Sequence, residues 1–367
     1  MVTRGPGPAL TALRHVVALD GLRGVAVLLV FCVHAAGNAA AVIAGLDLEA
    51  TTIHAMTTWS QRVLYWLHRS HHGVFLFFVL SGYLIGRMWW PQPQASYARF
   101  TWRRTLRIYP AFLLTFVASL VFAWTSETWS PPDAVRVLGN LLFLNGAPGS
   151  SVAPFNIVTW SLFYEMTFYL ALPLLVLMAS LLSPRAASWV PVAGIAVPIA
   201  AVLAGADPLV LCWTLLFSGV ALAYGQDRAV VALARLPTAM VVLAYLGVTT
   251  TALFDVIPAA MAILAFAAVA VMVLAKSVAG GNAIAALLGW RPLVLLGRIS
   301  YSFYLVHWMI VVLVARAVAG QHAAWGDATT ALAIFGGGFV LSAIAATTSW
   351  WLAERPYFRR RSDGPHE

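Results

Sequence analysis

Charged residues are scarce in this chain: they make up 10% of its 367 residues, while hydrophobic residues make up 61%. A composition this apolar excludes an ordinary soluble domain and indicates a bundle of membrane-spanning helices. Cysteine is almost absent as well. Cys32 and Cys212 both fall inside apolar stretches and lack the spacing of metal ligands, so we predict neither a disulfide framework nor a zinc site.

Internal boundaries are also missing. No linker, charge block, low-complexity stretch or internal repeat divides the chain, so we expect a single domain over residues 1–367, with short cytoplasmic tails at 1–18 and 355–367. The period-two alternation of barrel strands is lacking too, which leaves an all-α, polytopic membrane helix bundle. About ten stretches are apolar enough to span a membrane. They begin near residues 22, 73, 106, 160, 187, 208, 232, 257, 299 and 329.

Basic residues gather on one side of these stretches. If the N-terminus is cytoplasmic, all but four of the 22 lysines and arginines lie in cytoplasmic segments or at helix ends that face them; the four are Arg62, Arg69, Arg136 and Arg316. Because basic residues are retained on the cytoplasmic side, we predict a multi-pass protein of the inner or plasma membrane with both termini in the cytoplasm. The same rule accounts for the net charge of +9, which is therefore poor evidence for nucleic-acid binding.

One ionisable residue stands out inside the first apolar stretch. His34 follows Arg23 by eleven residues. On an α-helix this separation advances about 16 Å and returns to within about 20° of the starting direction, so both side chains share one face at different depths. Ionisable residues within the bilayer usually mark function, and this face combines an anion binder with a candidate base.

Five local patterns place polar groups where membrane helices seldom carry them. They are, in chain order, Leu19–Gly24 followed by His34, Gly73–Ile85, Arg103–Pro110, Trp160–Glu165 continuing to Leu170, and Ile299–Tyr301 with Tyr304–His307; Glu354–Pro356 closes the series. In the order and spacing of these patterns, nearly the whole chain resembles the integral membrane acyltransferase 3 family. The resemblance implies an acyl-CoA donor that approaches from the cytoplasm, with the first-helix histidine, His34, as the reactive residue.

Members of that family move acyl groups onto hydroxyls of polysaccharides, lipid-linked sugars or antibiotics. The resemblance implies a membrane-bound O-acyltransferase without a permanently bound cofactor or metal, which uses acyl-CoA, by family frequency acetyl-CoA, as co-substrate. The acceptor stays open among a glycan, a glycolipid and a secondary metabolite. The chain departs from the family pattern at Met309, where a proline is common, and at Met166, where a second acid often follows Glu165.

His34 and Glu165 are the predicted catalytic residues. Removal from water disfavours the charged imidazolium, which leaves a neutral His34 ring able to take the proton of an attacking hydroxyl. Glu165 lies about 8 Å into a span that begins on the outer side, and we expect it to orient the His34 ring as a carboxylate beside a catalytic histidine does. The alternatives are helix packing for His34 and a structural tie to Trp160, Tyr164 or an arginine for Glu165.

Four arginines are predicted to bind the donor. Guanidinium groups pair bidentately with phosphate oxygens, so we expect Arg103, Arg104 and Arg107 to meet the phosphates of CoA and Arg23 to extend that surface inward. The alternative for the first three is topology determination and contact with lipid headgroups.

A third set of residues is predicted to line the substrate cavity. Ser300, Tyr304 and His307 follow each other by four and three residues and so lie on one helix face, where tyrosine hydroxyls could donate to the thioester oxygen. Polar packing is the alternative. The step Ser81–Gly82 is predicted to be a packing site rather than a nucleophile. A competing function for the whole chain is a transporter or exporter that uses the same buried ionisable residues.

Overall fold

The computed structural model describes residues 16–89, 96–125 and 134–356. Its α-helices are α1 (Val17–Ala44), α2 (Trp59–His68), α3 (His72–Trp89), α4 (Tyr97–Thr125), α5 (Ala134–Leu141), α6 (Trp160–Leu182), α7 (Pro184–Ser188), α8 (Val190–Leu203), α9 (Leu211–Tyr224), α10 (Gln226–Ala234), α11 (Thr238–Leu253), α12 (Ala259–Ala279), α13 (Ala283–Leu288), α14 (Arg291–Arg298), α15 (Ser300–Ala319), α16 (His322–Leu332) and α17 (Gly338–Ser349). Short 3₁₀ turns lie at Ile53–Ala55, Leu144–Gly146, Ile157–Thr159 and Pro208–Val210, and π-helical turns at Ala333–Gly337 and Trp350–Glu354. These residues contain no strand.

The predicted all-α membrane bundle is confirmed. Within the described part of the chain, seven helical segments are long and apolar enough to cross a membrane, or eight when the bent pair Pro208–Tyr224 and Arg228–Ala234 counts as one span. Two shorter apolar helices, α8 and α11, account for the remaining predicted stretches. The count of about ten spans and the cytoplasmic position of both termini therefore stay predictions. The N-terminal tail up to residue 15 and the tail from residue 357 onward lie outside the described residues.

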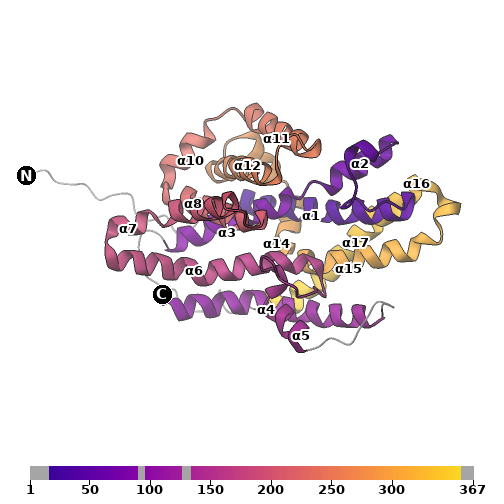
Figure 1. Cartoon of the computed structure of the whole chain (residues 1–367), viewed down its shortest axis with the longest axis horizontal. Coiled ribbons are helices and arrows are strands. Elements are labelled where there is room, and N and C mark those ends of the chain that lie inside the picture. Colours follow the sequence, from indigo (N-terminus) through magenta and orange to yellow (C-terminus); the bar gives the residue numbers. More distant parts are fainter. Residues whose placement is uncertain (1–15, 90–95, 126–133, 357–367) are drawn as a thin grey trace, which may run out of the picture.

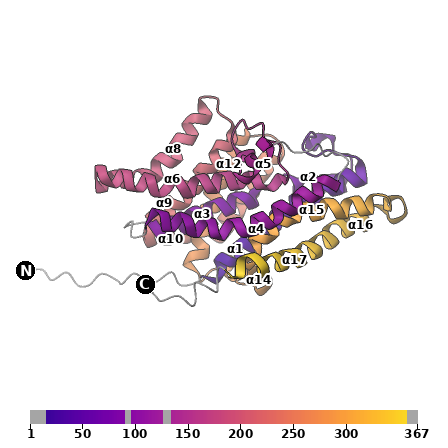
Figure 2. The same cartoon turned by 90° about the horizontal axis from the view of Figure 1, so that it is seen from below.

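The long helices run side by side along the longest axis of the molecule (Figure 1). Helices α2 and α16 lie toward one end of the bundle and α10 toward the other, and the perpendicular view agrees (Figure 2). Helix α1 contacts α2, α3, α14 and α15 and thus lies at the centre of the arrangement. Helix α1 is consequently surrounded by other helices.

Glycines let the neighbouring helices approach α1 closely. A Cβ added at Gly21 would lie 1.7 Å from the carbonyl oxygen of Leu288, and one at Gly24 would lie 2.1 Å from that of Leu293. The sequence pattern around Arg23 therefore has a packing cause, because Gly21 lets the end of α13 and Gly24 lets α14 lie directly against α1.

Helix α3 packs on α9 in the same manner. A Cβ at Gly82 would lie 1.8 Å from the carbonyl oxygen of Leu216, and one at Gly219 would lie 2.0 Å from that of Val79. The predicted packing role is thus confirmed for Gly82. Its neighbour Ser81 points elsewhere, into the site described next.

Candidate functional site

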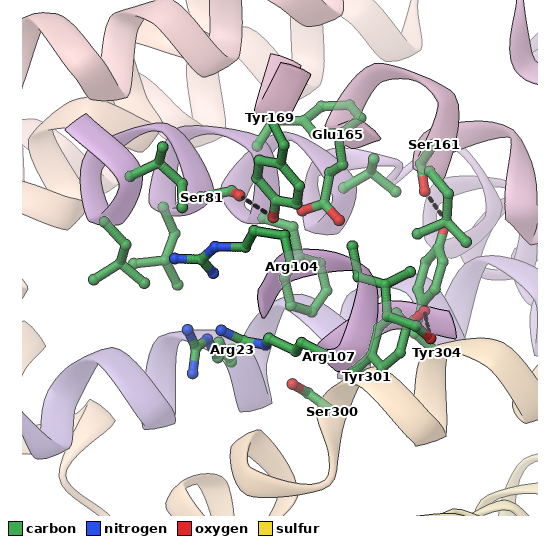
Figure 3. Close-up of a pocket in the computed structure, with 18 residues that line it drawn as sticks. Arg23, Ser81, Arg104, Arg107, Ser161, Glu165, Tyr169, Ser300, Tyr301 and Tyr304 are labelled. Carbon is green, nitrogen blue, oxygen red and sulfur yellow. Dashed lines mark hydrogen bonds between the residues drawn. The ribbon is translucent and has the colours of Figure 1, made fainter. Parts of the chain in front are cut away.

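A cavity of about 100 Å³ lies among α1, α3, α4, α6 and α15, and we call it the arginine cavity. Figure 3 shows Glu165 and Tyr169 on one side of it and Arg23, Arg107 and Ser300 across from them. Its polar lining consists of Arg23, Ser81, Arg104, Arg107, Ser161, Glu165, Tyr169, Ser300, Tyr301 and Tyr304.

Three of the four predicted donor-binding arginines line this cavity. Arg23 lies 3.6 Å from Asp20 and close enough to Arg107 for their like charges to interact. The guanidinium of Arg104 lies over the rings of Phe100 and Tyr169, at 5.4 and 5.5 Å from their centroids. Neighbouring like charges of this kind favour a bound anion. Arg103, the fourth, is exposed on α4 and does not line the cavity.

Glu165 is part of the arginine cavity. It hydrogen-bonds Ser81 and Tyr169, whose hydroxyls lie 2.9 Å apart, and it interacts with the charges of Arg104 and Arg107. Tyr169 belongs to the sequence pattern that begins at Trp160, but we predicted no role for it, although a residue four positions after Glu165 shares its helix face. The Glu165 carboxylate thus lies among the arginine side chains of this cavity, and its catalytic role stays a prediction.

A second cavity of about 510 Å³ extends from His34 of α1 to Trp66 of α2, and we call it the histidine cavity. Its lining includes His34, Glu49, Trp66, Arg69, His71, His72, Trp160 and Asp255, together with an apolar wall from Leu253 to Phe266. Glu165 does not belong to this lining, so the structure brings His34 and Glu165 to different cavities.

His34 instead faces His307. Their ring centroids lie 5.2 Å apart, and His307 is fully buried. Nδ1 of His307 lies 2.7 Å from the carbonyl oxygen of Tyr304 and 3.1 Å from that of Phe303. A carbonyl only accepts, so Nδ1 carries the proton, and in the neutral ring Nε2 is an acceptor. Among the described residues this Nε2 has no hydrogen-bond partner.

Tyr304 and Val74 line both cavities and form the boundary between them. The Tyr304 hydroxyl donates to the carbonyl oxygen of Val158 at 2.6 Å, and the hydroxyl of Ser161 lies 2.7 Å from it. Tyr301 donates to the carbonyl oxygen of Ile108 at 3.0 Å. Both tyrosine hydroxyls thus already donate to backbone carbonyl groups. These hydrogen bonds must break before either hydroxyl can donate to a thioester oxygen.

The three residues predicted to share a face of α15 therefore separate by depth. Ser300 and Tyr304 line the arginine cavity, whereas His307 lies deeper and contacts His34. In the described part of the chain, no group of three or more His, Cys, Asp or Glu side chains is arranged to hold a metal ion.

Comparison with known proteins gives a consistent result. Residues 16–347 match the family model described as "Acyltransferase domain". The chain is 32% identical over 162 residues to "Acyltransferase MdmB" of Streptomyces mycarofaciens, an alignment that covers 43% of this chain and 38% of that protein. It is 28% identical over 178 residues to "Putative membrane-bound transacylase BcsY" of Komagataeibacter xylinus, which covers 46% and 39%. The matches thus span about two fifths of each relative. No solved structure matches the chain.

Proposed function

Because this chain belongs to the acyltransferase family whose model spans residues 16–347, we propose that it is an O-acyltransferase of the inner or plasma membrane. It moves an acyl group, most simply acetyl, from acyl-CoA to a hydroxyl of a glycan, glycolipid or secondary metabolite. One observation carries the proposal: a cavity lined by three arginines and a cavity lined by a histidine meet at the same residue, Tyr304. Two substrates that enter from opposite ends can react at this boundary.

Acyl-CoA enters the arginine cavity in this proposal. The cavity volume of about 100 Å³ suits the acyl group and thioester but not the whole nucleotide. The CoA phosphates then lie at the entrance, where Arg104 and Arg107 pair with them through the fork geometry of guanidinium. Glu165 and Tyr169 hold Arg104 in place, so Glu165 acts on the donor side of the reaction.

The acceptor occupies the histidine cavity, whose volume of about 510 Å³ is in the usual range for small-molecule sites. His34 takes the proton of the acceptor hydroxyl as the oxygen attacks the thioester carbonyl. The new ester C–O bond forms, the C–S bond breaks, and the CoA thiolate leaves into the arginine cavity. His307 orients His34 in this proposal. The Nε2 of His307 has no hydrogen-bond partner among the described residues, and a small approach of the two rings, whose centroids lie 5.2 Å apart, lets it accept the ring N–H of His34 and leaves the other His34 nitrogen free as the base.

The test compares acylated glycans, lipids and small metabolites by mass spectrometry in cells that carry the wild-type gene, no gene or the His34→Ala variant. We expect one class of acylated product that is present only with the wild-type protein. Unchanged products in all three strains, or transport by proteoliposomes without acyl-CoA consumption, would refute the proposal and favour a transporter.

A further inference from the structure

Beyond the two cavities, a group of ionisable side chains at the end of the histidine cavity has no role in the reaction described so far. His68 and His71 have ring centroids 5.8 Å apart, and Nε2 of His68 lies 3.1 Å from Oε1 of Glu49. His71 and Glu49 line the same cavity as His34, and His34 interacts electrostatically with both histidines. These groups therefore connect the proposed base with the surface, where the Glu49 side chain is 65% exposed.

The 3.1 Å contact between Nε2 of His68 and Oε1 of Glu49 falls outside hydrogen-bond geometry, and its character depends on how many protons the His68 ring carries. Nδ1 of His68 lies 3.1 Å from the carbonyl oxygen of Val33, which only accepts, so Nδ1 carries a proton. In a neutral ring Nε2 would then be unprotonated and would face a carboxylate, another acceptor. The 3.1 Å contact is favourable only when a second proton lies between Nε2 and the carboxylate. His68 and Glu49 thus form a pair that binds one exchangeable proton.

Local structure holds this pair in place. Thr58 and Gln61 form a capping box that begins α2, and His68 is the last residue of that helix. His68 is buried, with 6% exposure, while His71 directly before α3 is exposed. His68 thus faces the interior, whereas His71 faces water.

Several titratable groups surround the His68–Glu49 pair. Arg69, next to His68, opposes a positive charge there, but its Nη2 lies 3.8 Å from Oδ1 of Asp255 on the segment between α11 and α12. His34 of α1 interacts electrostatically with His68 and His71, and also with His307 of α15. His72, at the start of α3, contacts the hydroxyl of Tyr245 at 3.3 Å and the ring of Phe266.

We propose that His71 and the His68–Glu49 pair form a proton outlet for His34, an inference that rests on the proposed function. The hydroxyl proton that His34 accepts passes to His71 and the pair and then to water at the α2 end of the bundle. The histidine cavity, at about 510 Å³, is large enough to hold water that would bridge the steps that exceed hydrogen-bond length. The CoA thiolate takes a different proton from water at the arginine end. Each turnover thus yields one ester and one CoA thiol, with one proton released at one end and one taken up at the other.

The first experiment follows turnover of the full chain in nanodiscs with acetyl-CoA and octyl glucoside as probe acceptor, and measures released CoA thiol. We expect Glu49→Gln, His68→Gln and His71→Gln to lower kcat by about tenfold or more without changing the KM for acetyl-CoA, and added imidazole to restore the rate. His322→Gln removes a histidine that contacts a carboxylate, Asp327 at 3.6 Å, outside both cavities, and is the matched control. Wild-type kcat in the three variants, or slow variants that imidazole does not rescue, would overturn the outlet.

A second measurement does not depend on turnover. Imidazole ¹⁵N chemical shifts of the full chain in nanodiscs at neutral pH should report a doubly protonated His68 in the wild type and a singly protonated His68 in Glu49→Gln. A singly protonated His68 in the wild type would overturn the proposal even if the protein transfers acyl groups. If wild-type turnover is absent while His68 is doubly protonated, the proton-holding pair stands and the proposed acyl transfer fails.

Discussion

The hydroxyl of Ser302 donates a 2.5 Å hydrogen bond to Oε1 of Glu354 and so joins the beginning of α15 to the end of the last helical segment. Glu354 is 5% exposed, lies in the π-helical turn Trp350–Glu354, and interacts with the charges of Arg107 and Arg23. The buried Glu354 carboxylate interacts with two arginines of the arginine cavity, which gives a physical reason for the closing Glu354–Pro356 pattern. It neutralises part of the charge that the arginine cavity concentrates.

Loss of this carboxylate should therefore affect both stability and donor binding. We expect Glu354→Ala to destabilise the protein by about 1.5–3 kcal/mol, because a buried charge-assisted hydrogen bond is lost. Glu354→Gln retains the acceptor for Ser302 and should lose less stability. Because both variants remove a negative charge near Arg23 and Arg107, both should lower the KM for the anionic acetyl-CoA. Thermal unfolding in detergent and CoA-release kinetics measure the two effects. Equal stability of both variants and the wild type would contradict this assignment.

The two adjacent arginines of α4 offer a matched comparison. Arg104 lines the arginine cavity between two aromatic rings, whereas Arg103 is exposed outside it. We expect Arg104→Lys to raise the KM for acetyl-CoA by about tenfold, equivalent to about 1.4 kcal/mol, because lysine cannot form the bidentate pair or the stacked contact. Arg103→Lys should leave the KM unchanged. If the two variants behave alike, the arginines serve topology rather than donor binding.

The role of His307 can be separated from donor binding. His307→Phe retains the ring shape but removes the Nε2 acceptor, so we expect kcat to fall by about 10- to 100-fold with little change in the KM for acetyl-CoA. His307→Gln, whose side-chain carbonyl can accept a hydrogen bond, should retain more activity. A loss confined to KM, or equal kcat in both variants, would show that His307 only packs against α1.

A fall in pH should remove the stabilisation that Glu49 contributes to the folded state. The contact with His68 lowers the pKa of Glu49 from 4.5 to about 2. The unfolded chain therefore binds more protons in this range, and the stabilisation is complete above about pH 4.5 and is lost as the pH falls toward 2. We expect the difference in Tm between the wild type and Glu49→Gln to be largest near pH 6 and to shrink toward about pH 3. A constant difference across this range would contradict the contact with His68.

Much of this architecture follows from patterns that a sequence displays directly. Apolar length predicts helices, and the eleven-residue spacing from Arg23 to His34 predicts two functional depths along one helix; in the structure these residues line two different cavities. The predicted partnership of Glu165 with His34 had a weaker basis. Distance along a span gives the depth of a side chain but not the direction in which the helix turns it, and Glu165 faces the arginines.

The histidines at the end of the bundle were missed for another reason. His68 lies on α2, a helix of ten residues between the first two predicted spans, and its partner Glu49 lies 19 positions earlier in the chain. Neither residue belongs to a local pattern. Only the tertiary fold, which folds α2 back against α1, brings their side chains together.

Close packing of α3 on α9 makes a final prediction that depends on backbone geometry alone. A methyl group at Gly82 would lie 1.8 Å from the carbonyl oxygen of Leu216, so α3 and α9 must separate. We expect Gly82→Ala to cost about 1–3 kcal/mol or more and to disturb the neighbouring Ser81. Gly247→Ala on α11 meets nothing within 4 Å and, as a helix-interior glycine, should stabilise the protein by about 0.5–1 kcal/mol. Thermal unfolding of the two variants measures this difference in stability. A Gly82→Ala protein as stable as Gly247→Ala would contradict the close contact between α3 and α9.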